Sequence, residues 1–181
     1  MTVKERIIKE LKEWVPYICI ALVLSFLITR YVGQRTRVDG VSMENTLHNE
    51  DQLITDKISY RFTDPKRFEV VVFPYAQDKK IHYIKRIIGL PGETIQIKDG
   101  YIHINGERLE EDYGNEHIMH SGSATTPLEI GEDEYFVMGD NRNNSKDSRD
   151  ELVGLIKRKD LLGKAWVRVY PFDQIGVVPH E

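Results

Sequence analysis

Apolar residues fall into one long run near the N-terminus and a series of short runs after it. Residues 14–29 (WVPYICIALVLSFLIT) carry no charge, and the run reaches Val32 if the Arg30 side chain extends to the membrane interface. As a helix, residues 14–32 would measure about 28 Å, close to the bilayer hydrocarbon core of about 30 Å. Apolar residues also recur at helical spacing just before the run, so the helix is expected to begin before residue 14.

The long run has three possible interpretations: a cleaved signal peptide, a retained membrane anchor, or a buried helix of a soluble core. A cleaved signal peptide ends in a small-x-small site, and residues 28–33 (ITRYVG) offer none. Trp14, Tyr17 and Tyr31 lie near the ends of the run, where aromatic rings favour the interface, and Pro16 falls in its first turn. The pattern predicts a retained anchor, while the basic residues around it favour a cytoplasmic N-terminus only weakly.

Beyond residue 32 the pattern changes to short β-prone runs separated by turn residues. Asp99-Gly100 and Asn105-Gly106 are dipeptides suited to tight hairpins. A polar stretch at 105–130 is expected to be an exposed excursion without chemistry. The pattern therefore predicts a mainly β protein, with an N-terminal transmembrane helix followed by an antiparallel β-rich domain. The expected strands cover residues 53–57, 69–73, 83–88, 94–98, 101–104, 135–138 and 165–170.

Composition narrows the class of protein. The chain has 181 residues, 25 Lys and Arg against 29 Asp and Glu, and a mean hydropathy of −0.43, which describe one water-facing domain outside the anchor. A pI near 5.9 argues against nucleic-acid binding. The single cysteine, Cys19, cannot form an intramolecular disulfide and fits no zinc or redox spacing.

Three segments are candidates for chemistry. In the first, residues 41–47 (VSMENTL), a loop after Asp39-Gly40 could present Ser42. In the second, residues 82–92 (HYIKRIIGLPG), strand alternation places Lys85 between two large apolar neighbours on one face and Arg86 on the other. Desolvation would lower the pKa of Lys85 and make it a general base, although its stem could instead cover apolar surface with the amine in water. Arg86 is expected to form an ion pair.

The third segment is residues 139–149 (GDNRNNSKDSR), which follows an apolar strand. Such a density of Asp, Asn, Ser and Arg is typical of a solvated turn, because these side chains hydrogen-bond nearby backbone. The same residues could also brace a loop with ion pairs and orient a neighbouring amine.

Together, these segments resemble three characteristic boxes of bacterial type I signal peptidases, in order and spacing. The resemblance covers nearly the whole chain from anchor to C-terminus, and one N-terminal anchor is similar to the small Gram-positive form. It implies a cytoplasmic segment at 1–13, an anchor at 14–32 and an extracytoplasmic catalytic domain at 33–181 in the cell membrane. Secretory precursors and the lipid bilayer are then the implied partners, with no nucleic acid, metal or cofactor. Closing segments at 153–156 (VGLI), 163–165 (GKA) and 170–172 (YPF) support the resemblance.

The resemblance also implies roles for particular residues. Ser42 would be the nucleophile, with its backbone N–H as an oxyanion donor, and Lys85 would be the general base that later protonates the departing amine. Ser145 would hydrogen-bond the Lys85 amine, and Tyr83 would help keep it dry. The implied reaction is removal of signal peptides after Ala-x-Ala-like sites.

Two further sets of residues belong to this expectation. Asp147 and Arg149 would pair to hold the 139–149 segment. By adjacency, Gly40, Val41 and Met43 are candidates for substrate binding.

The sequence departs from the family pattern at two places. Asn45 stands where many members have proline, and Gly40 has no side-chain hydroxyl to serve as a second oxyanion donor. These departures leave open a catalytically impaired, membrane-anchored homologue that binds precursors without efficient cleavage. A self-cleaving Ser/Lys regulator of the repressor type would need a further domain that this anchored chain lacks.

Histidine chemistry gives two further alternatives. A triad could combine Ser42 with His82 or His103 and with Asp140, although strand parity places His82 opposite Lys85. His117 and His120 could share a metal only if a third ligand were present.

Overall fold

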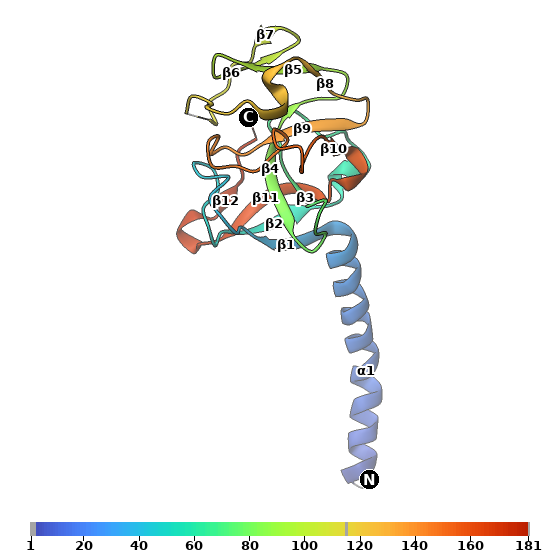
Figure 1. Cartoon of the computed structure of the whole chain (residues 1–181). Helices are drawn as coiled ribbons and strands as arrows, with labels where there is room; N and C mark the ends of the chain where they lie inside the picture. The colour runs from blue at the N-terminus through green and yellow to red at the C-terminus, as the bar shows by residue number, and fades with distance from the viewer. Residues whose placement is uncertain (1–2, 115, 181) are drawn as a thin grey trace.

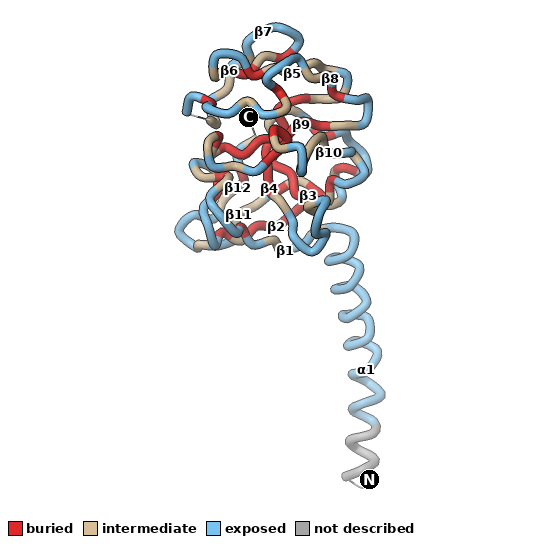
Figure 2. Tube along the Cα trace, in the orientation of Figure 1, coloured by how far each residue is buried: buried red, intermediate tan, exposed pale blue. Residues whose placement is uncertain are grey.

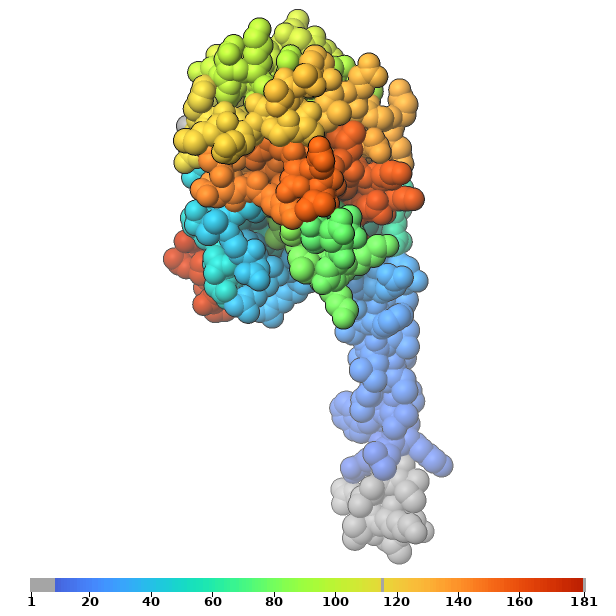
Figure 3. Space-filling view, in the orientation of Figure 1, coloured from blue at the N-terminus to red at the C-terminus, as the bar shows by residue number. Residues whose placement is uncertain are grey.

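The computed structural model describes the backbone of residues 3–114 and 116–180, and side chains from residue 9 within those ranges. Helix α1 (Val3–Leu27) continues through a single π-helical turn, η1 (Ile28–Val32), directly into the first strand. The helix projects away from the β domain (Figures 1 and 3). The most apolar 18-residue window within residues 9–32 has a mean hydropathy of 1.9, and none of that window is buried, which excludes the buried core helix. The first two residues of the expected cytoplasmic segment lie outside the described residues.

Pro16 lies inside α1 and not in a first turn, so that expectation was wrong. The reason is that the charged residues before the apolar run are helical as well, which moves the helix start to Val3. Proline has no N–H to donate to the carbonyl four residues earlier. That carbonyl belongs to Lys12, in the charged part of the helix where water can replace the missing donor.

Beyond Val32, the described residues contain two antiparallel sheets, joined by loops and short turns (Figure 1). The larger has the order β1-β2-β11-β3-β4-β9-β10, with β12 paired to β11, and the smaller has the order β7-β6-β5-β8. The larger sheet contains β1 (Gly33–Arg37), β2 (Gln52–Asp56), β3 (Val70–Pro74), β4 (His82–Gly89), β9 (Glu134–Met138), β10 (Ile156–Lys157), β11 (Gly163–Tyr170) and β12 (Gly176–Val177). The smaller contains β5 (Thr94–Lys98), β6 (Tyr101–Ile104), β7 (Glu107–Arg108) and β8 (Leu128–Glu129). Short 3-10 turns are η2 (Ser59–Arg61), η3 (Gly122–Thr125), η4 (Arg158–Asp160) and η5 (Phe172–Gln174).

The mainly β fold and the seven expected strands are confirmed, and the strand bounds agree to within about two residues. Both expected hairpin turns are present, with positive φ at each residue of Asp99-Gly100 and Asn105-Gly106. Strand β1 was not expected, because its sequence (GQRTR) has no apolar alternation. Among the described residues it pairs only with β2, at the edge of the sheet, so it can remain polar.

The expectation of an exposed excursion at 105–130 needs correction. The segment supplies β7, η3 and β8 to the smaller sheet and its surroundings. Ile118, Ala124 and Ile130 are buried in the hydrophobic cluster beneath that sheet. These apolar residues are isolated within polar sequence, so no periodic pattern revealed them.

Strand β4 lies where three hydrophobic clusters meet. It contributes Ile84 to one cluster, Ile87 to a second and Ile88 to a third. Figure 2 shows the buried segments gathered in the middle of the domain, around β4 and β9. Because its neighbours are locked by packing on several sides, β4 is a rigid support for Lys85 and Arg86.

Candidate active site

Ser42 lies on the loop between β1 and β2, and packing and hydrogen bonds fix that loop. Met43 and Leu47 are each 1% exposed in the cluster that also contains Ile84 of β4. The Leu47 N–H donates to the Met43 carbonyl at 2.8 Å, and the Asn141 N–H donates to the Ser42 carbonyl at 3.1 Å. Ser42 is thus held from both sides.

Asn45, the departure from the family pattern, has a φ of 88°. Proline is locked near −65°, so the observed loop conformation is closed to it, whereas asparagine tolerates positive φ. The loop therefore takes a turn that suits the residue present, and Thr46 and Leu47 follow in hydrogen-bonded positions.

Lys85 meets Ser42 inside the protein. Its side chain is 3% exposed, and Nζ donates to Ser42 Oγ at 2.6 Å and to the Ile84 carbonyl at 3.0 Å. Burial lowers the pKa of Lys85 to about 8, against the opposing charges of Asp147 and Asp140. No ion pair recorded between described residues includes Lys85. Strand alternation predicted that the Lys85 side chain lies among apolar neighbours, and in the structure this side chain is buried.

Tyr83 covers one side of the amine, as expected. Lys85 Nζ lies 5.2 Å from the centre of the Tyr83 ring. That ring stacks on Tyr75 with centroids 4.8 Å apart and packs edge-on against Phe73. The aromatic wall limits the access of water to Lys85.

Asp147 and Arg149 form the expected ion pair in the loop after β9. Arg149 Nε and Nη2 each donate to the Asp147 carboxylate at 2.8 Å. The Gly139 N–H donates to Asp147 Oδ2 at 3.0 Å. The pair therefore ties the far end of the loop to its beginning, where Gly139 leaves β9.

The hydrogen bond expected from Ser145 to Lys85 is absent. Ser145 Oγ is buried without a hydrogen-bond partner among the described residues. Both hydrogen bonds of the Lys85 amine go to Ser42 and Ile84. Ser145 is nevertheless next to the site, because a Cβ built on Gly139 would come within 2.3 Å of both Ser145 Oγ and the Ser42 carbonyl.

Arg86, on the opposite face of β4, forms the expected ion pair, and its partner is Asp140. The pair is bidentate, with Nε to Oδ1 at 2.8 Å and Nη2 to Oδ2 at 2.7 Å, and both side chains are fully buried. Thr46 Oγ1 donates to the same carboxylate at 2.5 Å. This link between Asp140 and the Ser42 loop was not predicted from the sequence. Strand alternation indicated only that Arg86 lies on the face of β4 opposite Lys85.

The hydrogen bonds of the described residues do not support the histidine triad, although His82 lines the same cavity as Ser42. Its acid, Asp140, is held by Arg86 and Thr46, and its nucleophile, Ser42, is bonded to Lys85. His103 lies on β6, in the other sheet, with its ring on the Tyr101 carbonyl.

The three candidate substrate-binding residues line the cavity that contains Ser42 and Lys85. This cavity measures about 230 Å³, and Gly40, Val41 and Met43 form part of its wall. Pockets for drug-sized ligands usually exceed about 300 Å³, so this cavity is small by comparison.

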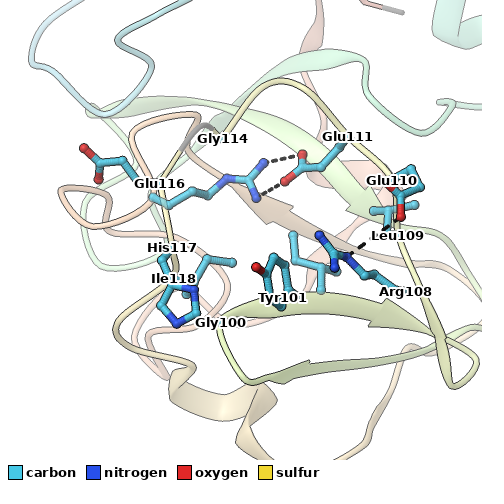
Figure 4. A pocket seen from close by; sticks show the side chains of 12 residues that line it. Gly100, Tyr101, Arg108, Leu109, Glu110, Glu111, Gly114, Glu116, His117 and Ile118 are labelled. Carbon is cyan, nitrogen blue, oxygen red and sulfur yellow. Dashed lines mark hydrogen bonds and ion pairs between the residues drawn. The ribbon is translucent and has the colours of Figure 1, made fainter.

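A second cavity of about 220 Å³ lies beside the smaller sheet, away from Ser42 (Figure 4). Its wall includes Glu111, which accepts two hydrogen bonds from the Arg142 guanidinium, and Arg142 Nε donates to the Gly139 carbonyl at 3.0 Å. His117 packs against Tyr101 at the same cavity. Across the described parts of the chain, no group of three or more His, Cys, Asp or Glu side chains could hold a metal, so His117 and His120 have no third ligand there.

The chain is similar in sequence to known signal peptidases. A solved signal peptidase I from Enterococcus faecalis V583 is 36% identical, with a TM-score of 0.47, over 56% of this chain and 97% of that one. The chain is 39% identical over 170 residues to Signal peptidase I P of Bacillus subtilis subsp. natto, covering 90% of this chain and 91% of that protein. It is 39% identical over 166 residues to a probable signal peptidase I-2 of Synechocystis, covering 89% and 74%. A family model described as signal peptidase, peptidase S26, matches residues 11–170, so the chain belongs to this family of serine endopeptidases.

Proposed function

We propose that this chain removes N-terminal signal peptides from secretory precursors, cutting after small-x-small sites with Ser42 as nucleophile and Lys85 as general base. The observation that carries the proposal is the 2.6 Å contact between Ser42 Oγ and a Lys85 amine that is almost fully buried. The substrate class follows from relatives named Signal peptidase I.

The dyad needs a neutral lysine at working pH. With a pKa of about 8, about one Lys85 in ten is neutral at pH 7, whereas an ordinary lysine would be neutral in only about three of ten thousand molecules. The neutral amine accepts the Ser42 proton as Oγ attacks the scissile carbonyl. The resulting ammonium then donates that proton to the departing amine of the mature protein. An acyl-enzyme on Ser42 remains, and water activated by Lys85 hydrolyses it.

The oxyanion of each tetrahedral intermediate needs fixed donors. The backbone N–H of Ser42 is the proposed donor, since the loop that carries it is held by Met43, Leu47 and Asn141. Gly40 offers no side-chain hydroxyl. Its φ of 106° suits glycine and lets the backbone turn beside the nucleophile.

The membrane arrangement completes the proposal. Helix α1 spans the bilayer as a single anchor, with the N-terminus in the cytoplasm and the β domain outside. An extended precursor segment would add to a sheet edge at the Ser42 cavity, with small side chains in the shallow wall near Val41 and Met43. The enzyme would thus meet its substrate where the precursor leaves the membrane.

Cleavage of a secretory precursor by the full chain in detergent tests this function. Wild type should cut after the small-x-small site, while Ser42→Ala and Lys85→Ala should remain folded and inactive. Lys98→Ala, an exposed lysine at the end of β5, is the matched control and should cut normally. Precursor that binds without being cut by wild type would instead support the impaired homologue, and full activity of Lys85→Ala would reject the dyad.

A further inference from the structure

Five cations surround a hollow where the membrane helix meets the β domain. The cavity measures about 430 Å³, and we call it the anchor pocket. It is lined by Arg30, Lys57, Arg61, Arg158 and Lys159, together with Tyr60, Leu161 and Leu162. Its cations come from three separate segments: η1, the β2–η2 region and η4.

The positive charge of the anchor pocket is largely uncompensated. Arg158 pairs with Asp64 at 3.2 Å, and that carboxylate is 90% exposed. No ion pair within the described part of the chain involves Arg30, Lys57, Arg61 or Lys159. Burial, followed by the charge of Arg30, lowers the pKa of Lys57. The cations therefore repel one another, and an anion in the hollow would relieve that repulsion.

Tyr31 connects the pocket to the membrane interface. The Arg30 and Arg61 guanidinium carbons lie 5.8 Å and 5.1 Å from the centre of its ring. Lys57 Nζ reaches back to the Thr29 carbonyl at 3.4 Å. Residues 14–32 would span about 28 Å as a helix, close to the hydrocarbon core of about 30 Å, so the C-terminal end of the anchor lies at the headgroup layer.

The side chains beside the pocket also suit a lipid surface. Ile58 and Phe62, which flank η2, are 39% and 81% exposed. Exposed apolar side chains next to cations are typical of segments that lie in the membrane interface. The anion available at this depth is the phosphate of a lipid headgroup.

We propose that the anchor pocket binds the phosphate headgroup of an anionic phospholipid in the bilayer that holds α1. The proposal rests on the membrane insertion described under the proposed function. It adds a lipid site that fixes the β domain against the membrane at the point where the helix ends. It needs no catalytic residue, since none of the pocket cations contacts Ser42 or Lys85.

Lipid titration of the full chain, followed by native mass spectrometry, tests the site. Phosphatidylglycerol and phosphatidylcholine are compared on wild type and on Lys57→Gln/Arg61→Gln. Each cation near an anionic surface contributes about a fivefold gain in affinity, so the double variant should bind phosphatidylglycerol about 25-fold more weakly. The control, Lys98→Gln/Arg108→Gln, removes the same charge from the smaller sheet and should keep wild-type affinity. Normal precursor cleavage in detergent shows that both variants are folded.

Each alternative result has a definite meaning. Equal binding of the two lipids by wild type, or equal losses in both double variants, would overturn the headgroup site. Inorganic phosphate that competes at the same concentration as phosphatidylglycerol would show a general anion site instead and would also overturn it. Reconstitution into pure phosphatidylcholine vesicles tests the anchor separately, because a chain released from them would contradict membrane insertion whatever the pocket binds.

Discussion

The two faces of β4 give two neighbouring buried basic side chains opposite surroundings. Lys85 is almost fully buried and has no carboxylate partner among the described residues, and its amine touches a hydroxyl and a carbonyl. Arg86, one residue later, is fully buried against the Asp140 carboxylate in a bidentate pair. Burial without a counter-charge favours a neutral base, whereas burial with one favours a permanent ion pair.

The difference assigns separate tasks to the two faces. In the proposed function, the Lys85 face supplies a proton acceptor next to Ser42, and its cost is the desolvation of an amine. The Arg86 face fixes geometry, because Asp140 also accepts from Thr46 on the Ser42 loop, and Arg86 Nη1 donates to the Phe68 and Pro179 carbonyls. Removing a residue from one face should therefore affect activity, and removing one from the other should affect stability.

The sharpest test of the Lys85 face is Lys85→Met. Loss of the general base should lower kcat/KM by at least about 10³-fold, while the free energy of unfolding stays equal or increases because a desolvated amine is removed. Lys85→Arg should also be inactive, because a guanidinium is never neutral at working pH. Kinetics on a precursor peptide and thermal unfolding measure the two quantities. Retained activity in Lys85→Arg would contradict the role of Lys85 as a neutral general base.

Substitutions on the Arg86 face of β4 should lower the stability of the protein. Arg86→Met leaves the Asp140 carboxylate buried and unpaired, so the free energy of unfolding should fall by about 3–5 kcal/mol. The double variant Arg86→Met/Asp140→Leu should recover much of that loss, because neither charge then remains buried. Denaturant unfolding of the full chain in detergent measures both. A double variant no more stable than the single one would show that the pair is not the source of the loss.

The pH dependence of cleavage reports on Lys85. Because only the neutral amine accepts a proton, kcat/KM should fall about tenfold for each pH unit below the pKa of about 8 and level off above it. The charge of Asp147 raises the pKa of Lys85, so Asp147→Asn should move this limb to lower pH. The same depression of the Lys85 pKa makes stability increase between about pH 8 and 10.5, where the unfolded chain still binds the proton and the folded chain does not. A limb that stays in place in Asp147→Asn would contradict this electrostatic coupling.

The sequence predicted the parts of the site that depend on local pattern. Alternation along 83–88 placed Lys85 and Arg86 on opposite faces, and turn dipeptides located the hairpins. It could not predict contacts between distant segments, such as Thr46 with Asp140, because nothing local encodes which carboxylate a buried arginine meets. Strand β1 and the burial of Ile118 were not predicted for a related reason. Both depend on tertiary neighbours, and no periodic pattern in the local sequence indicates them.

The smallest effect is expected from Ser145, whose buried hydroxyl has no hydrogen-bond partner in the described parts of the chain. In the proposed mechanism, acylation of Ser42 Oγ removes a hydrogen-bond partner of the Lys85 amine, and the Ser145 hydroxyl, which lies near the Ser42 carbonyl, would replace that partner. Ser145→Ala should then lower kcat about tenfold, the value of one hydrogen bond, while the free energy of unfolding changes by no more than about 0.5 kcal/mol. Single-turnover kinetics and thermal unfolding measure the two effects, with Thr125→Ala as a control, because the Thr125 hydroxyl bonds the Gly122 carbonyl within η3 and lies outside the site. An unchanged kcat would show that Ser145 has no role in the reaction. A large loss of stability would show that its hydroxyl already has a structural partner in the free enzyme.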